Sequence, residues 1–499
     1  MPISAEVFYL IVLTQVFYLV WNIKSIVFFA RLDREKLFAD AGAVESSSDG
    51  STRLPRITAI LAARNEPEPV LRRSLLSLLS LDYPVEKKEI LLVTDSDDMN
   101  TCMIADRLSQ ELGLIHVVVP KNSDPSWSKV ISEARGRGCK WADIEVEQLP
   151  YSKPRALTYA LPKATGQIVT VVDAEDVQGD PRVFQKAARC LEIKGYDAVQ
   201  GRLRFVNYRD SWLSLQAVGD YSFWFRGLLP KVRFIGLPVA LGGTCYYVRR
   251  DVLDSVGGWD PTNVTEDLEL GLRLYGLGYR VGIIDVDTYE ESPRSLLRTR
   301  NDGGWANQRT RWIRGTLYTM GRLGRYRREF SARRKIAIGL LLFYYLLGMF
   351  VPFLSIIGYP SMLVSLLAAI LWPIWSISGS QTLGTAVSVV SVLVPQTDNQ
   401  WLAGISLLNM ILLVWTILLT VQGIVGTVGK TMNGVKEKIH YYGLAGFTLM
   451  FYWILWGLPV LRALWQMSRG AKFWEKTLHE GLHYTVLDRY SADAKRHYG

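Results

Sequence analysis

Apolar residues divide the chain into three regions. Residues 7–30 form one nearly continuous apolar run, residues 56–289 alternate short apolar runs with amphipathic stretches, and residues 336–460 are again largely apolar. A run of about 20 apolar residues is long enough to cross a lipid bilayer as a helix. The pattern therefore predicts membrane helices in the first and third regions and a soluble domain between them.

The middle region has the pattern of an α/β domain. Helices are predicted over residues 69–81 and 103–112, and buried strands are predicted over residues 57–62, 90–94, 115–119 and 168–172. Strands that alternate with helices favour a doubly wound, mostly parallel sheet. Ligands of such sheets bind beyond the carboxyl ends of the strands. The residues that directly follow each strand are therefore the first candidates for a site.

Acidic residues follow three of the predicted strands. Glu66 lies shortly after the first strand, Asp95 and Asp98 follow the second, and Asp173 and Glu175 follow the fourth. One acidic loop is typical of a solvated turn. Three acidic loops at corresponding strand ends predict a single binding site.

The loop that contains Asp173 and Glu175 is the best candidate for a metal site. Two carboxylates one residue apart on a tight turn can hold Mg²⁺ or Mn²⁺ and leave positions open for a diphosphate. No histidine lies near the loop in the sequence, which favours these ions over zinc. Lys153 and Arg155 offer positive charge for a diphosphate. The alternative is a surface turn ahead of Gly179-Asp180-Pro181.

A second candidate stretch runs from residue 264 to residue 312. It begins with Thr265-Glu266-Asp267, which alone is an ordinary helix-capping pattern. Near its end, spacings of three and four residues place Trp305, Gln308 and Trp312 on one helical face with Arg309. Indoles stack on sugar rings and guanidinium groups match phosphate oxygens, so this face suits a sugar phosphate. An amphipathic helix at a membrane surface is an alternative, and the two are compatible.

The charge of the chain indicates anionic partners. The chain has 499 residues, a formal net charge of +10 and a pI near 9.2. The basic residues crowd next to the apolar runs, which favours a membrane surface over nucleic acid. The four cysteines are far apart in the sequence and form no Cys-x-x-Cys pair, so a zinc site is not expected.

Basic residues also predict how the chain enters the membrane. Arg31, Arg34 and Lys36 follow the first apolar run, which places the next segment in the cytosol and the N-terminus outside. A cleaved signal peptide is the alternative, but no basic segment precedes the run and no small-residue cleavage site closes it. Residues 322–335 are strongly basic, so the third region is expected to enter from the cytosolic side.

The third region contains several candidate spans. Residues 336–357 and 401–425 are strong candidates, and residues 363–377 and 442–460 are weaker ones. Basic residues flank the last of these on both sides, so one basic segment must face outward if it spans. An interfacial or re-entrant segment would keep both inside, and the number of spans stays open.

Several short motifs occur in a fixed order over residues 55–330. They are Arg64-Asn65-Glu66, the acids at 95–98, Lys153 with Ala156-Leu157, Asp173-Ala174-Glu175, Leu241-Gly242-Gly243-Thr244 ahead of Arg249-Arg250, Gly257-Gly258-Trp259-Asp260, Thr265-Glu266-Asp267 and Gln308-Arg309-Thr310-Arg311-Trp312. A weaker match continues at Trp474-Glu475-Lys476-Thr477. With this ordered set the chain resembles a membrane-integrated family 2 glycosyltransferase of the cellulose-synthase-like group, whose catalytic domain has the α/β GT-A fold.

The resemblance implies a role for each matching residue. Glu66 and one acid of the second loop, Asp95 or Asp98, would contact the nucleoside of a nucleotide-sugar donor, and Lys153 would meet its diphosphate. Asp173 and Glu175 would coordinate Mn²⁺ or Mg²⁺, and Asp267 would be the catalytic base. The acceptor and the diphosphate would be framed by Glu266, Gln308, Arg311 and Trp312.

The chain departs from the family pattern in three ways. Its metal loop reads Asp-Ala-Glu instead of Asp-Ala-Asp, which keeps a carboxylate but changes its reach. It has no Phe-x-Val-Thr-x-Lys gating segment and no appended regulatory domain of the cyclic-dinucleotide type. These departures argue against the synthesis of long polymers.

The sequence thus predicts an inverting hexosyltransferase of the cell membrane with its catalytic domain on the cytosolic face. The chain resembles the small transferases of this group that lack the gating segment, including archaeal enzymes of protein N-glycosylation. This resemblance implies transfer of mannose from GDP-mannose to a lipid-linked glycan, and no nucleic-acid partner is expected. UDP-glucose and UDP-N-acetylglucosamine are other possible donors. The alternatives are a processive polysaccharide synthase that uses a UDP-sugar and a non-enzymatic membrane assembly component with a degenerate transferase domain.

The sequence also predicts six segments along the chain. They are an N-terminal membrane helix at 1–30, a linker at 31–54, a GT-A domain at 55–293, interfacial amphipathic helices at 294–335, membrane helices at 336–466 and a basic tail at 467–499.

Overall fold

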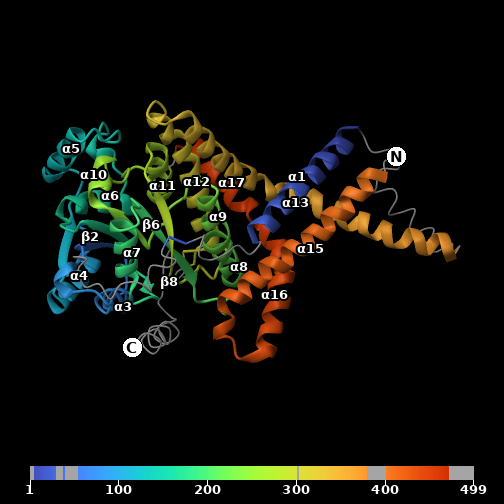
Figure 1. Ribbon diagram of the computed structural model, residues 1–499, viewed down its shortest axis with the longest axis horizontal. Helices are drawn as coiled ribbons and strands as arrows, with labels where there is room; N and C mark the ends of the chain where they lie inside the picture. Colours follow the sequence, from blue (N-terminus) through green and yellow to red (C-terminus); the bar gives the residue numbers. More distant parts are fainter. Residues whose placement is uncertain (1–4, 30–37, 40–53, 300–302, 379–399, 471–499) are drawn as a thin grey trace. The chain divides into compact units, whose positions relative to one another are not determined.

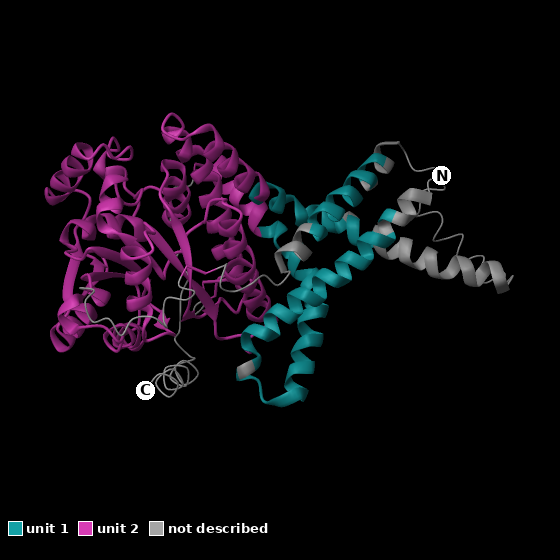
Figure 2. Cartoon of the chain, viewed as in Figure 1, with its two compact units in different colours: residues 1–31, 345–458 teal, residues 32–344, 459–499 magenta. Residues whose placement is uncertain are grey.

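The structure of the protein is a computed structural model that describes residues 5–29, 38–39, 54–299, 303–378 and 400–470 (Figure 1). The chain forms two compact units (Figure 2). The smaller unit takes residues 1–31 and 345–458, and the larger takes residues 32–344 and 459–499. The predicted linker and basic tail lie largely outside the described residues.

The larger unit is built on a mixed, mostly parallel sheet of eight strands in the order β3-β2-β1-β4-β7-β6-β8-β5. In chain order the strands are β1 Ile57–Ala63, β2 Lys88–Asp95, β3 Ile115–Val119, β4 Ile168–Asp173, β5 Val177–Gln178, β6 Ala198–Phe205, β7 Tyr246–Arg249 and β8 Val281–Glu290. The first four strands are parallel neighbours, and β6 is parallel to β8. The short strands β7 and β5 run antiparallel to the strands they pair with. This architecture confirms the predicted GT-A fold class.

Helices connect the strands and continue beyond the sheet. They are α3 Glu68–Leu79, α4 Met99–Leu112, α5 Ser126–Gly136, α6 Lys153–Ala160, α7 Val183–Glu192, α8 Trp212–Tyr221, α9 Leu229–Phe234, α10 Arg250–Ser255, α11 Glu266–Leu277, α12 Trp305–Leu323 and α17 Gly457–Ser468. A π-helical segment, Ser222–Leu228, joins α8 to α9.

The four predicted strands and both predicted helices are present. One helix, α4, begins earlier than predicted, and a local side chain explains the difference. Helix α4 begins at Met99, ahead of the predicted start at residue 103, because the Asp98 carboxylate caps it. That carboxylate accepts a hydrogen bond from the Thr101 amide at 3.2 Å. The helix ends as predicted, where Gly113 takes the left-handed conformation with φ of 69°.

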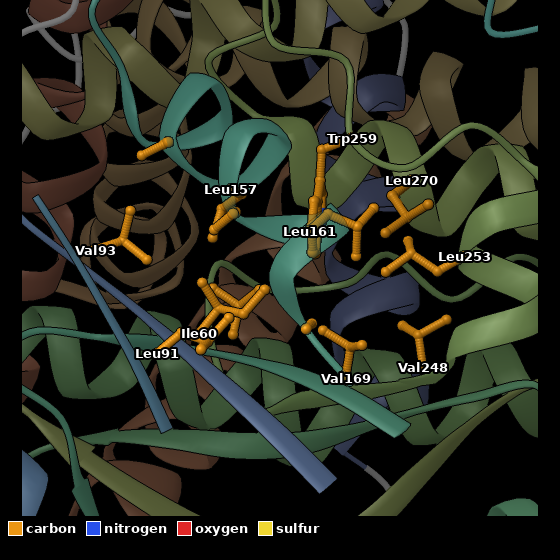
Figure 3. Close-up of a cluster of buried hydrophobic side chains, with 14 of the residues drawn as sticks. Ile60, Leu91, Val93, Leu157, Leu161, Val169, Val248, Leu253, Trp259 and Leu270 are labelled. Atoms are coloured by element: carbon orange, nitrogen blue, oxygen red, sulfur yellow. The ribbon is translucent and has the colours of Figure 1, made fainter. Parts of the chain in front are cut away.

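The main hydrophobic core lies between the strands and helices α6 and α11 (Figure 3). Ile60, Leu91 and Val169 of the central strands pack with Leu157 of α6 and Leu270 of α11, and each is at most 1% exposed. Close packing of this kind leaves little freedom for the strands to shift. The core therefore fixes the positions of the loops that leave the carboxyl ends of the strands.

The smaller unit is made of apolar helices: α1 Ala5–Phe29, most of α13 Ala332–Ser378, α15 Gln400–Val428 and α16 Gly434–Leu455. Two buried polar groups of this unit have backbone partners on another helix: the Tyr18 hydroxyl of α1 donates to the Val351 carbonyl at 3.4 Å, and the Asn409 amide of α15 donates to the Gln15 carbonyl at 2.7 Å. Buried polar groups in an apolar bundle need such partners.

Three stretches of the described chain are long and apolar enough to cross a membrane: Ala332–Ile356, Leu407–Val428 and Gly434–Ser468. They overlap three of the predicted spans. The predicted N-terminal span forms the helix α1, and the described side chains within it include the apolar stretch Val12–Ile23. Residues 363–377 continue the first stretch within α13 and form no separate helix.

Candidate active site

The three acidic loops leave the sheet at one edge, as predicted. In the register of the central strands, Ala63 at the end of β1 faces Thr94 of β2, and Ala62 faces Asp173 of β4. Since these strands are parallel neighbours, the loops with Glu66, the second-loop acids and Asp173 start side by side. Parallel pairing is the physical reason that residues far apart in the sequence meet here.

Lys153 connects the loop that follows β4 to the segment that contains Gly243. It is the first residue of α6, and its Nζ donates hydrogen bonds to the Asp173 carboxylate and, at 2.6 Å, to the Gly243 carbonyl. Burial alone would lower the pKa of this lysine, but the nearby carboxylates Asp173 and Glu266 raise it above the ordinary value. Lys153 therefore keeps its positive charge inside the site.

Gly243 lies at the centre of the predicted site residues. A Cβ atom added to it would lie 3.5 Å from Asp267 Oδ2, 3.6 Å from Asp173 Oδ2 and 3.7 Å from Lys153 Nζ. The three groups come from the start of α11, the end of β4 and the start of α6. The structure thus brings together the predicted base, a predicted metal ligand and the predicted diphosphate contact around one backbone position.

The loop after β4 is held by a residue that was not assigned a role from the sequence. The Asp176 carboxylate accepts hydrogen bonds from the Asp173 amide at 3.1 Å and from the Thr244 hydroxyl. Burial and the neighbouring Asp173 raise the pKa of Asp176 well above its ordinary value. Asp176 is fully buried, and it fixes the turn on which Asp173 and Glu175 are placed.

Helix α11 presents two carboxyl groups at its N-terminus. Burial, followed by the charge of Asp267, raises the pKa of Glu266 to about 8. Burial is also the main cause that raises the pKa of Asp267, to about 6, with a further contribution from Asp173. Both acids are therefore more basic than an ordinary carboxylate, and the increase is larger at Glu266 than at Asp267.

Helix α12 is docked against the start of α11. The Asn263 amide donates to the Thr319 hydroxyl at 2.8 Å, and Gly315 lies directly against Thr265. Arg311, on the same helix, interacts electrostatically with Asp173, and also with Glu266 and Glu175. Burial nevertheless lowers the pKa of Arg311. The two predicted candidate regions thus form one site.

The predicted face of α12 is formed, but some of its side chains are buried in the protein interior. Trp305 and Arg309 are fully buried, and the Arg309 guanidinium lies 4.0 Å from the centroid of the Trp312 ring. It also donates to Gln308 Oε1 at 2.8 Å and pairs with Asp220 at 2.9 Å. The expectation that the whole face forms an open wall was wrong for Trp305 and Arg309. Buried pairing with Asp220 explains why Arg309 can face the protein interior.

Trp312 remains partly exposed and has an aromatic neighbour. Its ring centroid lies 6.1 Å from that of Tyr221, at an interplanar angle of 31°. Tyr221 is the last residue of α8, and burial raises its pKa well above the ordinary value. Two partly exposed aromatic rings therefore lie next to each other at this end of the site.

The predicted nucleoside contacts are tied into the protein by hydrogen bonds and ion pairs. Asp95 pairs with the buried Arg155 at 2.6 Å and with Arg64 at 2.8 Å. Asp98 accepts from the Asn65 amide at 2.6 Å as well as capping α4. Arg155 was predicted to offer positive charge to a diphosphate. It is instead fully buried, and its guanidinium donates a hydrogen bond to the Asp95 carboxylate. Only the neighbouring Lys153 therefore reaches Asp173 in the way the sequence suggested.

The backbone just before Glu66, a predicted nucleoside contact, has a left-handed conformation. Glu66 is buried at 4% exposure, and Asn65 before it has a positive φ of 51°. The hydrogen bond from the Asn65 amide to Asp98 holds this left-handed backbone in place. The conformation at Asn65 sets the direction in which the chain continues to Glu66.

The residues at the β4 end suit a divalent cation in part. Asp173 and Glu175 are close enough for the charge of Glu175 to raise the pKa of Asp173, after burial, which is the main cause. A bound cation relieves such repulsion. Within the described residues no group of three or more His, Cys, Asp or Glu side chains forms a complete metal site. A cation here would therefore need ligands from a substrate as well.

Comparison with known proteins gives one family match. Residues 168–379 match the family described as "Glycosyl transferase family group 2", and this stretch includes Asp173, the Gly243 segment, α11 and α12. These residues thus carry a glycosyltransferase family 2 domain with a GT-A-like fold.

Two curated relatives and one solved structure are similar to the chain. "Probable glycosyltransferase YdaM" from Bacillus subtilis is 26% identical over 306 residues, which cover 61% of this chain and 64% of the relative. "Beta-monoglucosyldiacylglycerol synthase" from Synechocystis is 27% identical over 310 residues, which cover 60% of this chain and 56% of the relative. The chain therefore matches less than two thirds of the length of either.

The solved structure is "Mannosyltransferase PcManGT from Pyrobaculum calidifontis in complex with GDP-Man and Mn2+". Its TM-score is 0.45 with 18% sequence identity, and the match covers 82% of this chain and 97% of that one.

Proposed function

We propose that this chain is a membrane-bound, inverting glycosyltransferase that moves a hexose from a nucleotide sugar to a membrane-linked acceptor. The observation that carries the proposal is the gathering of Asp173, Lys153 and Asp267 around Gly243. A carboxylate that can hold a cation, a buried lysine and a carboxylate that can accept a proton are the groups that this reaction requires.

Asp267 is the proposed general base. In the reaction the acceptor hydroxyl attacks the anomeric carbon, a new carbon–oxygen bond forms, and the bond to the diphosphate breaks on the opposite face. The hydroxyl proton passes to Asp267, and the nucleoside diphosphate leaves with the bonding electrons. A base whose pKa is about 6 is ionised at pH 7 and basic enough to accept a proton in the transition state.

Lys153 and Arg311 are the proposed contacts of the leaving diphosphate. Lys153 is held by the Asp173 carboxylate and the Gly243 carbonyl, and Arg311 lies within electrostatic reach of Asp173 and Glu175. Cations fixed in advance stabilise negative charge as it develops, without reorganising during the reaction. Burial raises the pKa of Glu266 to about 8, and in its protonated form Glu266 can donate a hydrogen bond to the same region.

A divalent cation, Mn²⁺ or Mg²⁺, is the proposed cofactor. Asp173 and Glu175 would hold it, and the diphosphate would supply further oxygen ligands. When bound, the ion supplies charge neutralisation for the departing diphosphate.

The acceptor is proposed to approach from the Trp312 and Tyr221 side. Both rings are partly exposed and lie next to each other, and aromatic faces suit the apolar face of a sugar ring. Membrane-crossing candidates in the same chain, and the lipid product in the name of the Synechocystis relative, favour a lipid-linked acceptor. The site is proposed to lie on the cytosolic side of the cell membrane, because basic residues cluster between the catalytic stretch and the first C-terminal span.

GDP-mannose and a lipid-linked glycan of the kind used in N-glycan assembly are the first donor and acceptor to test, on the strength of the sequence resemblance. UDP-glucose and UDP-N-acetylglucosamine are the alternatives. A processive synthase would give a ladder of products from one acceptor, whereas a single-sugar transferase gives one product.

The testing experiment uses the purified full-length chain in lipid nanodiscs. Thermal unfolding is measured with GDP, UDP and the three nucleotide sugars, with and without Mn²⁺, because a ligand that binds the folded state raises its melting temperature. The donor that gives the largest shift is then assayed for transfer to lipid acceptors. A Mn²⁺-dependent shift with transfer supports the proposal. Absence of both binding and transfer would favour a non-enzymatic membrane component instead.

A further inference from the structure

Helix α17 packs along α12 inside the larger unit, although about 150 residues separate the two in the sequence (Figure 1). The Arg314 guanidinium of α12 donates to Gln466 Oε1 of α17 at 2.9 Å. The Arg462 guanidinium of α17 donates to Asn307 Oδ1 of α12. Asn307, Arg314 and Gln466 are at most 5% exposed. Such sheltered bonds hold their partners in one geometry, because breaking them leaves buried polar groups unpaired.

The two hydrogen bonds lie on either side of Arg311 along α12. Asn307 lies four residues before Arg311 and Arg314 lies three residues after it, so the three residues share one side of α12. On α17, Arg462 and Gln466 are also four residues apart and face the same way. Helix α17 therefore holds the turns of α12 on both sides of Arg311.

Much of the remaining surface of α17 suits lipid. Leu461, Leu464 and Trp465 are each more than half exposed, at 57%, 51% and 58%. Helix α17 is the last part of the apolar stretch Gly434–Ser468, which is longer than the roughly 20 residues that a bilayer requires. Apolar side chains with a flanking arginine are typical of a helix at the bilayer surface.

We propose that α17 is a brace for the catalytic helix, and that Arg462 and Gln466 are positioning residues that hold Arg311 at the diphosphate site. The inference rests on the proposed function for the role of Arg311. The brace does not touch the substrate. It acts by keeping α12 at the distance that the reacting groups need, and small displacements of such groups reduce turnover strongly.

The test compares four variants and one control variant of the full-length chain in nanodiscs. Gln466→Leu and Arg462→Met remove the bonds, whereas Gln466→Glu and Arg462→Lys keep an acceptor and a donor. Ser468→Ala, at the exposed end of the same helix, is the control. The measurements are kcat and KM for the donor, and hydrogen–deuterium exchange of the α12 amides over residues 305–316.

The proposal expects Gln466→Leu and Arg462→Met to lower kcat about tenfold, with the donor KM changed less than about threefold. The α12 amides should exchange faster in both, while the conservative variants and the control behave like the wild type. A loss of kcat without faster exchange in α12, or faster exchange without a loss of kcat, would overturn the proposal. If Arg462→Met does not fold, the Gln466 pair alone decides.

The experiment also separates the brace from the proposed function. If the wild type transfers no sugar with any donor, the proposed function fails. The exchange data then decide on the brace alone. Faster exchange of α12 in Gln466→Leu but not in Gln466→Glu supports it, and equal exchange in the two overturns it.

Discussion

The Asn263 side chain donates a hydrogen bond to the Thr319 hydroxyl at 2.8 Å. Both groups are buried, with exposures of 1% and 0%. Asn263 precedes α11 by three residues and Thr319 lies in the second half of α12. This bond and the adjacent contact between Gly315 and Thr265 set the distance from the proposed base to Arg311. The first prediction follows from that contact.

Gly315→Ala should reduce both stability and turnover. The added Cβ would lie 2.5 Å from Thr265 Oγ1 and 2.9 Å from Thr265 Cβ, so the two helices must move apart. Overpacking of this kind costs about 1–3 kcal/mol. Gly321→Ala is the matched control, because it lies on the same helix with no atom within 4 Å of the added Cβ. That control should be neutral or slightly stabilising, by about 1 kcal/mol or less. Similar melting temperatures and turnover for the two variants would show that this contact does not position the site.

Asp173→Asn should abolish transfer and remove the Mn²⁺-dependent stabilisation by a nucleoside diphosphate. The substitution removes a charged oxygen ligand and also the negative charge that pairs with Lys153. Thermal unfolding with GDP or UDP, with and without Mn²⁺, checks this. Asp124→Asn, at an exposed turn, is the control and should keep the full shift. A full Mn²⁺-dependent shift in Asp173→Asn would place the cation elsewhere.

Trp312→Ala should weaken the use of the acceptor more than the use of the donor. The substitution removes one of two adjacent aromatic rings but no group assigned to the diphosphate. The expected defect grows as the acceptor is diluted and shrinks at saturating acceptor, while the donor KM stays within about threefold. Initial rates over a range of acceptor concentrations test this. An equal loss at all acceptor concentrations would exclude the assigned role.

Lys231 gives a prediction for the dependence of stability on pH. It is 6% exposed on α9, and burial lowers its pKa from 10.5 to about 8. Between these two values the unfolded chain holds a proton that the folded chain has lost, so stability from this group rises as pH rises from about 8 to 10.5. Lys231→Met should therefore be more stable than the wild type at pH 7, by an amount on the order of 1 kcal/mol. It should also lack this rise in melting temperature between pH 8 and 10. A parallel pH profile for the two proteins would contradict the assignment.

Local sequence patterns predicted the elements and the edge of the sheet where the site lies. The apolar runs at β1, β2 and β4 are almost fully buried strands, as predicted, whereas the run at β3 was wrongly expected to be buried, because this edge strand exposes Ile115 and Val118. Parallel pairing places the residues that follow the strands together. Asp173 was therefore found from the strand pattern, whereas Lys153 and Asp267 were joined to the same site by the family resemblance. Their proposed roles rest on the family resemblance as well.

Long-range packing could not be read from the sequence. Gly243 reaches the site because β7, which follows it, pairs with β4 some 70 residues earlier in the chain. Arg155 was expected to contact the diphosphate. Its ion-pair partner Asp95 lies 60 residues away in the sequence, and no local pattern predicts that the two residues pair. The bonds between α12 and α17 cross more than 150 residues. Each of these contacts is set by tertiary packing and not by periodicity or local spacing.

The most direct test of the central claim is Asp267→Asn, with nucleotide affinity and single-turnover rate measured on the same protein. The substitution keeps the size and polarity of the side chain but removes the proton acceptor. A general base acts in the transition state and contributes little to ground-state binding. The account predicts a nucleotide Kd within a few-fold of the wild type and a transfer rate about 10²–10⁴ times lower. Transfer at the wild-type rate would contradict the account, because Asp267 would then be only an acidic residue that stabilises the start of α11.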